Sequence, residues 1–125
     1  MGYAHKGYGK IFCQRKLTQK EKGAVDKAAL WFTSGLRIMF DDTGNGTCIG
    51  ISMAGHLYDG AKTRADLESL TAAIAKDGIG VDFGELVIEG DGATKRFLLR
   101  DSQWVEQAAQ IIWIDVGLTN TARVM

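Results

Sequence analysis

The sequence has few of the residues on which metal centres and disulfide frameworks depend. Its 125 residues include two cysteines and two histidines, His5 and His56. Neither histidine stands in a metal-ligand spacing such as His-x-x-x-His, so we expect no bound metal or cofactor. No apolar run approaches the roughly eighteen uncharged residues that a membrane-spanning helix needs. The N-terminus lacks the apolar core of a secretory signal, and we therefore expect a cytoplasmic protein with no membrane partner.

The two cysteines, Cys13 and Cys48, both fall in predicted strands. Without an export signal they are expected to be reduced, buried thiols rather than a disulfide. A reactive cysteine would need a cationic, partly exposed setting or a second cysteine nearby. The sequence indicates neither, so thiol chemistry is not predicted.

The chain has no net charge, but its charges are unevenly distributed. Residues 1–40 contain eight lysines and arginines and only two acidic residues, and the remaining residues balance this surplus. Such asymmetry can mark a nucleic-acid-binding face or a charge-steered dimer, or simply a solvated helix face. The last interpretation is favoured, because a charged segment within a neutral protein produces only a weak long-range field.

The chain is organised around the stretch 18–54. Thr18-Gln19-Lys20-Glu21 has the pattern of a capping box, in which the threonine hydroxyl and the glutamate carboxylate satisfy amides at a helix start. The pattern predicts a helix over 18–34 that ends at Gly35. A strand over 9–14 precedes this helix, and strands over 36–41 and 48–53 follow it, joined by a glycine-containing turn.

The same plan returns over 63–101. Thr63-Arg64-Ala65-Asp66 resembles a second cap, with Asp66 in the place of the usual glutamate. Leu67, Leu70 and Ile74 follow at helical spacing, which predicts a helix that Gly78 ends. Residues 79–84 read as irregular. Strands over 85–89 and 94–101 then form a hairpin about Gly90-Asp91-Gly92.

The C-terminal part is harder to assign. A turn is predicted at Asp101-Ser102 and a final strand over 111–116, which is apolar on both faces. Residues 102–110 combine good helix formers with strand formers and remain open between helix and strand. Residues 1–8 are predicted to be an N-terminal arm and 119–125 a loose tail.

Together these elements predict one α+β domain over residues 1–125. The order is β-α-β-β-α-β-β-β, whose first six elements have the ferredoxin-like order. Two helices would pack on one face of a mainly antiparallel sheet, and the two additional C-terminal strands would extend an edge of that sheet.

The segment Lys6–Cys13 carries a local motif. Its sequence Lys-Gly-Tyr-Gly-Lys-Ile-Phe-Cys resembles the octamer of the RNA recognition motif, in which aromatic side chains on a strand stack on bases. Lys10 and Cys13 stand where that octamer has aromatic residues, and the octamer lies on the third strand of that family rather than on the first. The alternative is a glycine-rich entry into an edge strand.

Two further features suggest contacts with other molecules. His56, Tyr58 and Asp59 lie together in a predicted linker and could form an acid/base set. Trp31 stands beside Leu30 and Phe32, so at least one of these three side chains must point away from the main apolar stripe of the helix, as at many protein contacts. The alternative is a wide apolar face covered by the N-terminal arm.

Three pieces of the chain resemble a group of small bacterial and phage proteins of uncharacterised function. They are the opening Met1-Gly2-Tyr3, the hairpin Gly84–Gly92 and the following Asp101-x-x-Trp104-Val105. The resemblance implies a microbial origin, with the gene carried on a mobile element, and it implies no activity.

Taken together, the sequence favours a non-enzymatic interaction module that binds a protein partner, with itself as a homodimer. One alternative is a small-ligand or nucleotide-binding domain with a pocket beside the linker 55–62. The other is RNA binding through Lys6, Tyr8 and Lys10. The candidate partner or ligand surface comprises Tyr3, His5, Lys6, Tyr8, Lys10, Trp31, His56 and Tyr58.

Overall fold

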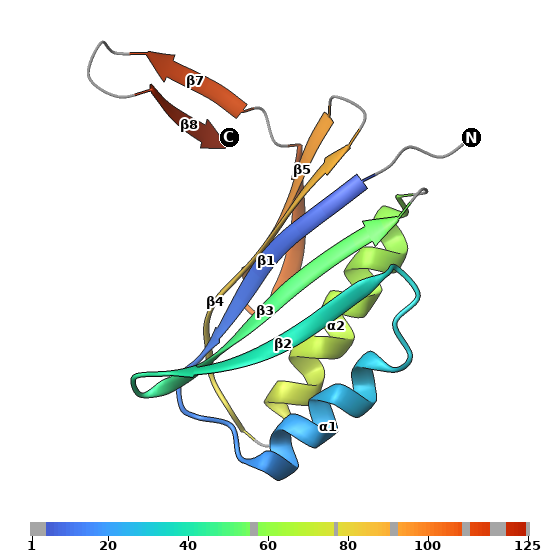
Figure 1. Cartoon of the computed structure of the whole chain (residues 1–125), viewed down its shortest axis with the longest axis vertical. Helices are drawn as coiled ribbons and strands as arrows, with labels where there is room; N and C mark the ends of the chain where they lie inside the picture. Colours follow the sequence, from blue (N-terminus) through green and yellow to red (C-terminus); the bar gives the residue numbers. More distant parts are fainter. Residues whose placement is uncertain are drawn as a thin grey trace.

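The computed structural model of the chain contains two helices packed beside a six-stranded antiparallel sheet (Figure 1). It describes residues 5–55, 58–76, 78–90, 93–108, 111–115 and 120–124. The elements are β1 (His5–Cys13), α1 (Gln19–Ala29), β2 (Leu36–Thr43), β3 (Gly46–Gly55), α2 (Gly60–Ala75), β4 (Val81–Gly90), β5 (Ala93–Arg100), β6 (Gln103–Ala108), β7 (Ile111–Asp115) and β8 (Asn120–Val124). Within the described ranges, no helix is long and apolar enough to span a membrane.

The sheet has the strand order β2-β3-β1-β4-β5-β6. Side chains alternate across a strand, so the register decides which of them share a face. Ile11 of β1 lies opposite Ile49 of β3 and Gly84 of β4. The face that carries Ile11 packs against the helices, and the side chains that exclude solvent completely there include Ile11, Ile49, Leu67, Leu70, Ile74, Leu86 and Phe97.

The predicted α+β class and antiparallel sheet are confirmed. The complete strand order is not that of a four-stranded ferredoxin-like sheet, because β5 and β6 extend the sheet beyond β4. The prediction that the final strand extends this sheet was wrong: β7 pairs with β8 in a separate two-stranded sheet. β8 occupies most of the segment that was predicted to be a loose tail.

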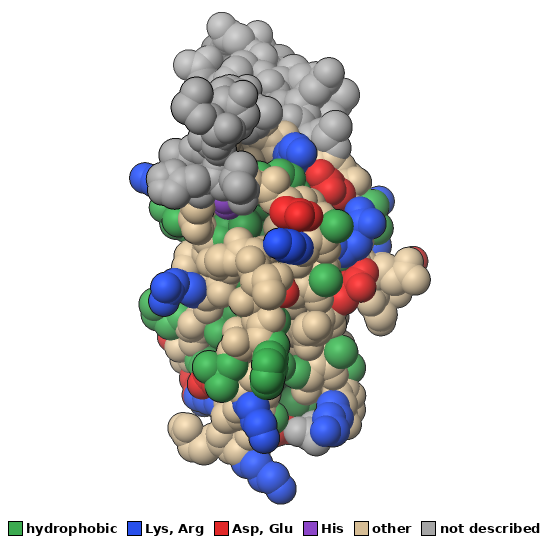
Figure 2. Space-filling view, turned by 90° about the vertical axis from the view of Figure 1, so that its right-hand side faces the viewer, with side chains coloured by type: hydrophobic (Ala, Val, Ile, Leu, Met, Phe, Trp, Pro, Cys, Tyr) green, Lys and Arg blue, Asp and Glu red, His purple; other side chains and the backbone are tan. Residues whose placement is uncertain are grey.

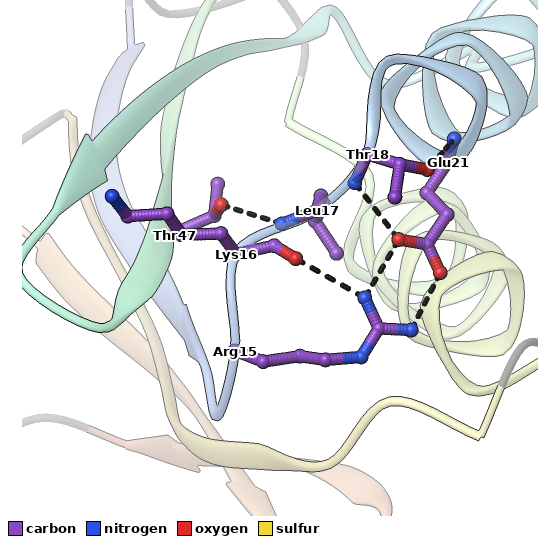
Figure 3. A network of polar contacts seen from close by, with 6 residues as sticks. All are labelled: Arg15, Lys16, Leu17, Thr18, Glu21 and Thr47. Atoms are coloured by element: carbon purple, nitrogen blue, oxygen red, sulfur yellow. Dashed lines mark hydrogen bonds and ion pairs between the residues drawn. The ribbon is translucent and has the colours of Figure 1, made fainter.

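The start of α1 confirms the capping box (Figure 3). The Glu21 amide donates to the Thr18 hydroxyl at 3.1 Å, and the Thr18 amide donates to the Glu21 carboxylate at 2.8 Å. Arg15 holds the same carboxylate through two hydrogen bonds of 2.7 Å. The Leu17 amide donates to Thr47 of β3 at 2.9 Å, which ties this turn to the sheet.

α1 ends five residues earlier than predicted, at Ala29. The amides of Trp31 and Phe32 still donate to carbonyls three residues back. The amides of Thr33 and Ser34 donate instead to the carboxylate of Asp66 on α2, at 3.1 and 2.8 Å. This distant acceptor draws the backbone out of the helical path, and Gly35 completes the turn at φ +85°.

α2 begins before the predicted cap. Its N-cap is Asp59, whose carboxylate accepts from the Lys62 amide at 3.0 Å. Thr63 was predicted to be this cap; it is instead buried in the first turn, where its hydroxyl donates to the Asp59 carbonyl at 2.8 Å. Asp66 was expected to complete that cap and instead binds the loop after α1.

The segment 79–84, predicted to be irregular, contains the start of β4. Phe12 pairs with Phe83, whereas Cys13 pairs with Val81, so the register shifts by one residue at this point. A shift of this kind is a β-bulge, and it interrupts the alternation of apolar and polar residues by which a strand is recognised.

The remaining strands depart from their predicted bounds at the two ends of the chain. β1 begins at His5, so half of the predicted arm 1–8 belongs to the sheet. Residues 103–108, left open between helix and strand, form β6 and pair with β5. The turn predicted at Asp101-Ser102 is confirmed, and both residues have positive φ angles.

Candidate functional site

The side of the sheet opposite the helices is here called the helix-free face. It carries the even-numbered side chains of β1, namely Lys6, Tyr8, Lys10 and Phe12, and the side chains paired with them on neighbouring strands. Among the described residues, none of the helices covers this face. Tyr8 is 68% exposed there, which is unusual for a tyrosine at the centre of a sheet.

A trough runs along β3 on the helix-free face. Tyr8 of β1 and Arg37 of β2 both pair with Ser52 of β3, and Lys10 and Met39 both pair with Gly50. Because β3 has small side chains on this side, the larger side chains of β1 and β2 form the walls. A cavity of about 310 Å³ lies here, lined by Lys6, Tyr8, Arg37, Ser52 and Ala54 among others.

The chemistry of the trough is aromatic and cationic. Lys6, Lys10 and Arg37 surround Tyr8. Asp41 on β2, together with Glu89 and Glu85, which lie opposite Lys6 and Lys10 on β4, carries negative charge on the same face. The charges on the neighbouring strands β4 and β5 are partly matched, since Arg96 forms a 2.5 Å ion pair with Glu85.

Towards the C-terminal end of β1, the helix-free face carries two more aromatic side chains, Phe12 and Phe83. The rings of Phe12 and Phe83 lie 6.2 Å apart, and the Lys10 amino group lies 5.4 Å from the centre of the Phe12 ring. Both phenylalanines are about one-third exposed. The aromatic surface therefore extends from Tyr8 to the bulge on β4.

His5, a candidate from the sequence, lies on the other face of β1 and is buried. Its ring packs edge-on against Tyr58 at 5.9 Å, and neither ring nitrogen has a hydrogen-bond partner among the described residues. Burial and the nearby charge of Glu106 raise the pKa of Tyr58 well above its ordinary value. Lys95 lies 4.4 Å from the centre of the Tyr58 ring. This arrangement favours a neutral, packed tyrosine.

Of the acid/base set proposed for His56, Tyr58 and Asp59, the structure describes only Tyr58 and Asp59. Asp59 is occupied as the cap of α2, and Tyr58 faces His5 and Lys95. His56, like Tyr3, lies outside the described residues. Within the part of the chain that is described, no three metal-binding side chains gather into a metal site.

The cysteines lie on opposite faces of neighbouring strands and are not bonded to each other. Burial raises the pKa of Cys13 to about 11, with a further contribution from Cys48. Burial also raises the pKa of Cys48. Both thiols are therefore protonated near neutral pH, a state of low nucleophilicity.

Trp31 occupies a different surface, at the C-terminal end of α1. It is 82% exposed and the adjacent Leu30 is 81% exposed, whereas Phe32 packs against the core. Figure 2, which looks at the molecule from the right-hand side of Figure 1, shows hydrophobic side chains among lysines and arginines in its lower half.

A second cavity, of about 960 Å³, lies between α2 and strands β4 to β6. Its lining includes Arg64, Glu68, Ile79, Leu99, Asp101 and Trp104. The small-ligand interpretation placed a pocket beside residues 55–62, whereas this cavity reaches the C-terminal half of α2.

Sequence reasoning found Lys6, Tyr8 and Lys10 on the helix-free face but missed Arg37, Met39 and Phe12. Alternation along β1 was sufficient to place Phe12 with Tyr8. Arg37 and Met39 become neighbours of the tyrosine only through the register of β2, β3 and β1, which no short motif encodes.

Comparison with known proteins gave no match to a family model and no significant match to a curated protein or to a solved structure.

Proposed function

We propose that the chain is a non-enzymatic module that binds single-stranded nucleic acid, RNA in particular, on its helix-free face. The observation that carries this proposal is the exposed ring of Tyr8 at the centre of β1, with Lys6, Lys10 and Arg37 around it. Proteins that bind single strands combine aromatic platforms for the bases with cations for the phosphates.

The trough suggests how a strand would bind. A base would stack on Tyr8, while the three cations contact the adjacent phosphates. The small side chains of β3 leave room for the sugar-phosphate backbone between the walls. With three phosphate contacts, the logarithm of the association constant should fall with the logarithm of salt concentration with a slope of about −2.

We also infer a ferredoxin-like arrangement for β1 to β4 with the two helices, to which β5 and β6 are added. The supporting observation is that β1 pairs with both β3 and β4, and β2 pairs with β3. In such a scaffold the helices stabilise one side of the sheet, and the other side is free to bind a ligand.

The test is fluorescence anisotropy with labelled oligouridine, and with oligodeoxythymidine to separate RNA from DNA. Tyr8→Ala should weaken binding by roughly 5- to 150-fold, because stacking on one aromatic side chain contributes ~1–3 kcal/mol per base. Tyr8→Phe keeps the ring and should retain most of the affinity.

The matched control is Trp31→Ala, which removes another exposed aromatic side chain, outside the helix-free face. It should leave affinity unchanged. Absence of binding at low salt, or equal losses in Tyr8→Ala and Trp31→Ala, would contradict the proposal.

A further inference from the structure

The sheet has two edge strands, β2 and β6, and β2 is the longer of the two. All eight of its residues pair in continuous register with β3, and none of the described strands pairs with its outer side. An unpaired strand edge can bind another strand through its free amides and carbonyls. Proteins often block such an edge with proline or a bulge. The chain contains no proline, and the register of β2 is uninterrupted.

The central residues of β2, 37–41, are complementary to themselves. If two β2 strands pair antiparallel about Met39, Arg37 of each copy lies opposite Asp41 of the other. The same register sets Ile38 opposite Phe40 and Met39 opposite its own counterpart. Residues directly opposite in an antiparallel pair share a face. The charged pairs and the Met39 pair therefore lie on the helix-free face, and the Ile38–Phe40 pairs lie on the helix side.

The side chains involved are available for this contact. Met39 is 74% exposed, and Ile38 and Phe40 are only half-buried, although both pack against the core. Arg37 and Asp41 form no ion pair among the described residues. A foreign strand would have to match both a positive and a negative charge, whereas a second copy of this chain matches both.

We infer that two copies of the chain form a symmetric dimer by pairing their β2 strands about Met39. The twofold axis of this dimer is perpendicular to the combined sheet. The helices of both copies therefore lie on the same side of the sheet, and the two helix-free faces become continuous. Five strand spacings of about 4.8 Å separate the two β1 strands, which places them roughly 24 Å apart. The inference does not depend on RNA binding, although it would join two troughs into one surface.

The decisive experiment uses charge reversal and measures mass by analytical ultracentrifugation. Arg37→Asp and Asp41→Arg each place like charges opposite one another twice in the dimer, and each should raise the dissociation constant of the homodimer about tenfold or more. An equimolar mixture of the two variants restores both opposite-charge pairs and should dimerise. The double variant Arg37→Asp/Asp41→Arg should also dimerise, which shows that the single variants fail through charge and not through misfolding.

The register is tested separately by cross-linking. Met39→Cys places two thiols at the twofold axis and should form a covalent dimer on mild oxidation. Val105→Cys, on the opposite edge strand, is the control and should cross-link no more than the wild-type chain. A monomeric wild-type chain at high concentration, single variants that dimerise like the wild type, or a mixture that stays monomeric would overturn the inference.

Discussion

The two helices are attached to the sheet by different means. α1 buries only Glu21 and Val25, and its first turn is held by the polar network of Arg15, Thr18 and Glu21. α2 buries five side chains, which include Leu67, Leu70 and Ile74. Two helices with the same place in a repeated plan can therefore owe their stability to different forces: apolar burial for α2 and hydrogen bonding for α1.

The largest effect is expected in α2. Leu70→Ala should lower the free energy of unfolding by ~2–5 kcal/mol, because it leaves a cavity at a side chain that has no exposed area. Val25→Ala is the corresponding change in α1 and should cost about 1.5 kcal/mol or slightly more, since it removes two methyl groups. Urea denaturation measures the free energy of unfolding of both variants. Equal losses of unfolding free energy in Leu70→Ala and Val25→Ala would contradict the view that apolar burial stabilises α2 more than α1.

A smaller effect is expected at the start of α1. Thr18→Ala removes the hydroxyl that accepts from the Glu21 amide and should cost ~1 kcal/mol, within a usual range of about 0.5–2 kcal/mol for N-caps. Thr18→Ser keeps the acceptor and should cost much less. If the serine and alanine variants were equally unstable in urea, the hydroxyl would not be what holds this turn.

Whether a part of the fold could be predicted from the sequence depends on how far apart in the chain its interacting residues lie. The cap of α1 lies within four consecutive residues, and the local pattern predicted it correctly. The end of α1 could not be predicted in this way, because the Asp66 carboxylate that accepts from the Ser34 amide lies 32 residues away. Taking Asp66 as part of a local cap also misplaced the start of α2.

The residues of the candidate site also fall into two groups, those that the sequence alone could place together and those that only the folded sheet brings together. Lys6, Tyr8 and Lys10 share a face because they alternate along one strand, so the sequence alone grouped them correctly. His5 was grouped with them but has the opposite parity and is buried against Tyr58. Arg37 joins the site through the pairing of three strands, and this register is a property of the folded sheet.

The last effect depends on pH and also acts on α1. The two hydrogen bonds from Arg15, with help from the Thr18 amide, lower the pKa of Glu21 from 4.5 to about 2. A carboxylate with a lowered pKa in the folded state stabilises the fold above its ordinary pKa, and this stabilisation is lost as pH falls from about 4.5 to about 2. Thermal melting of the wild-type chain and of Glu21→Gln should therefore differ at pH 6 and converge near pH 2, whereas Glu68→Gln, at an exposed position on α2, should behave like the wild type throughout. A difference between wild type and Glu21→Gln that persisted unchanged at pH 2 would mean that the charge of Glu21 does not hold α1 in place.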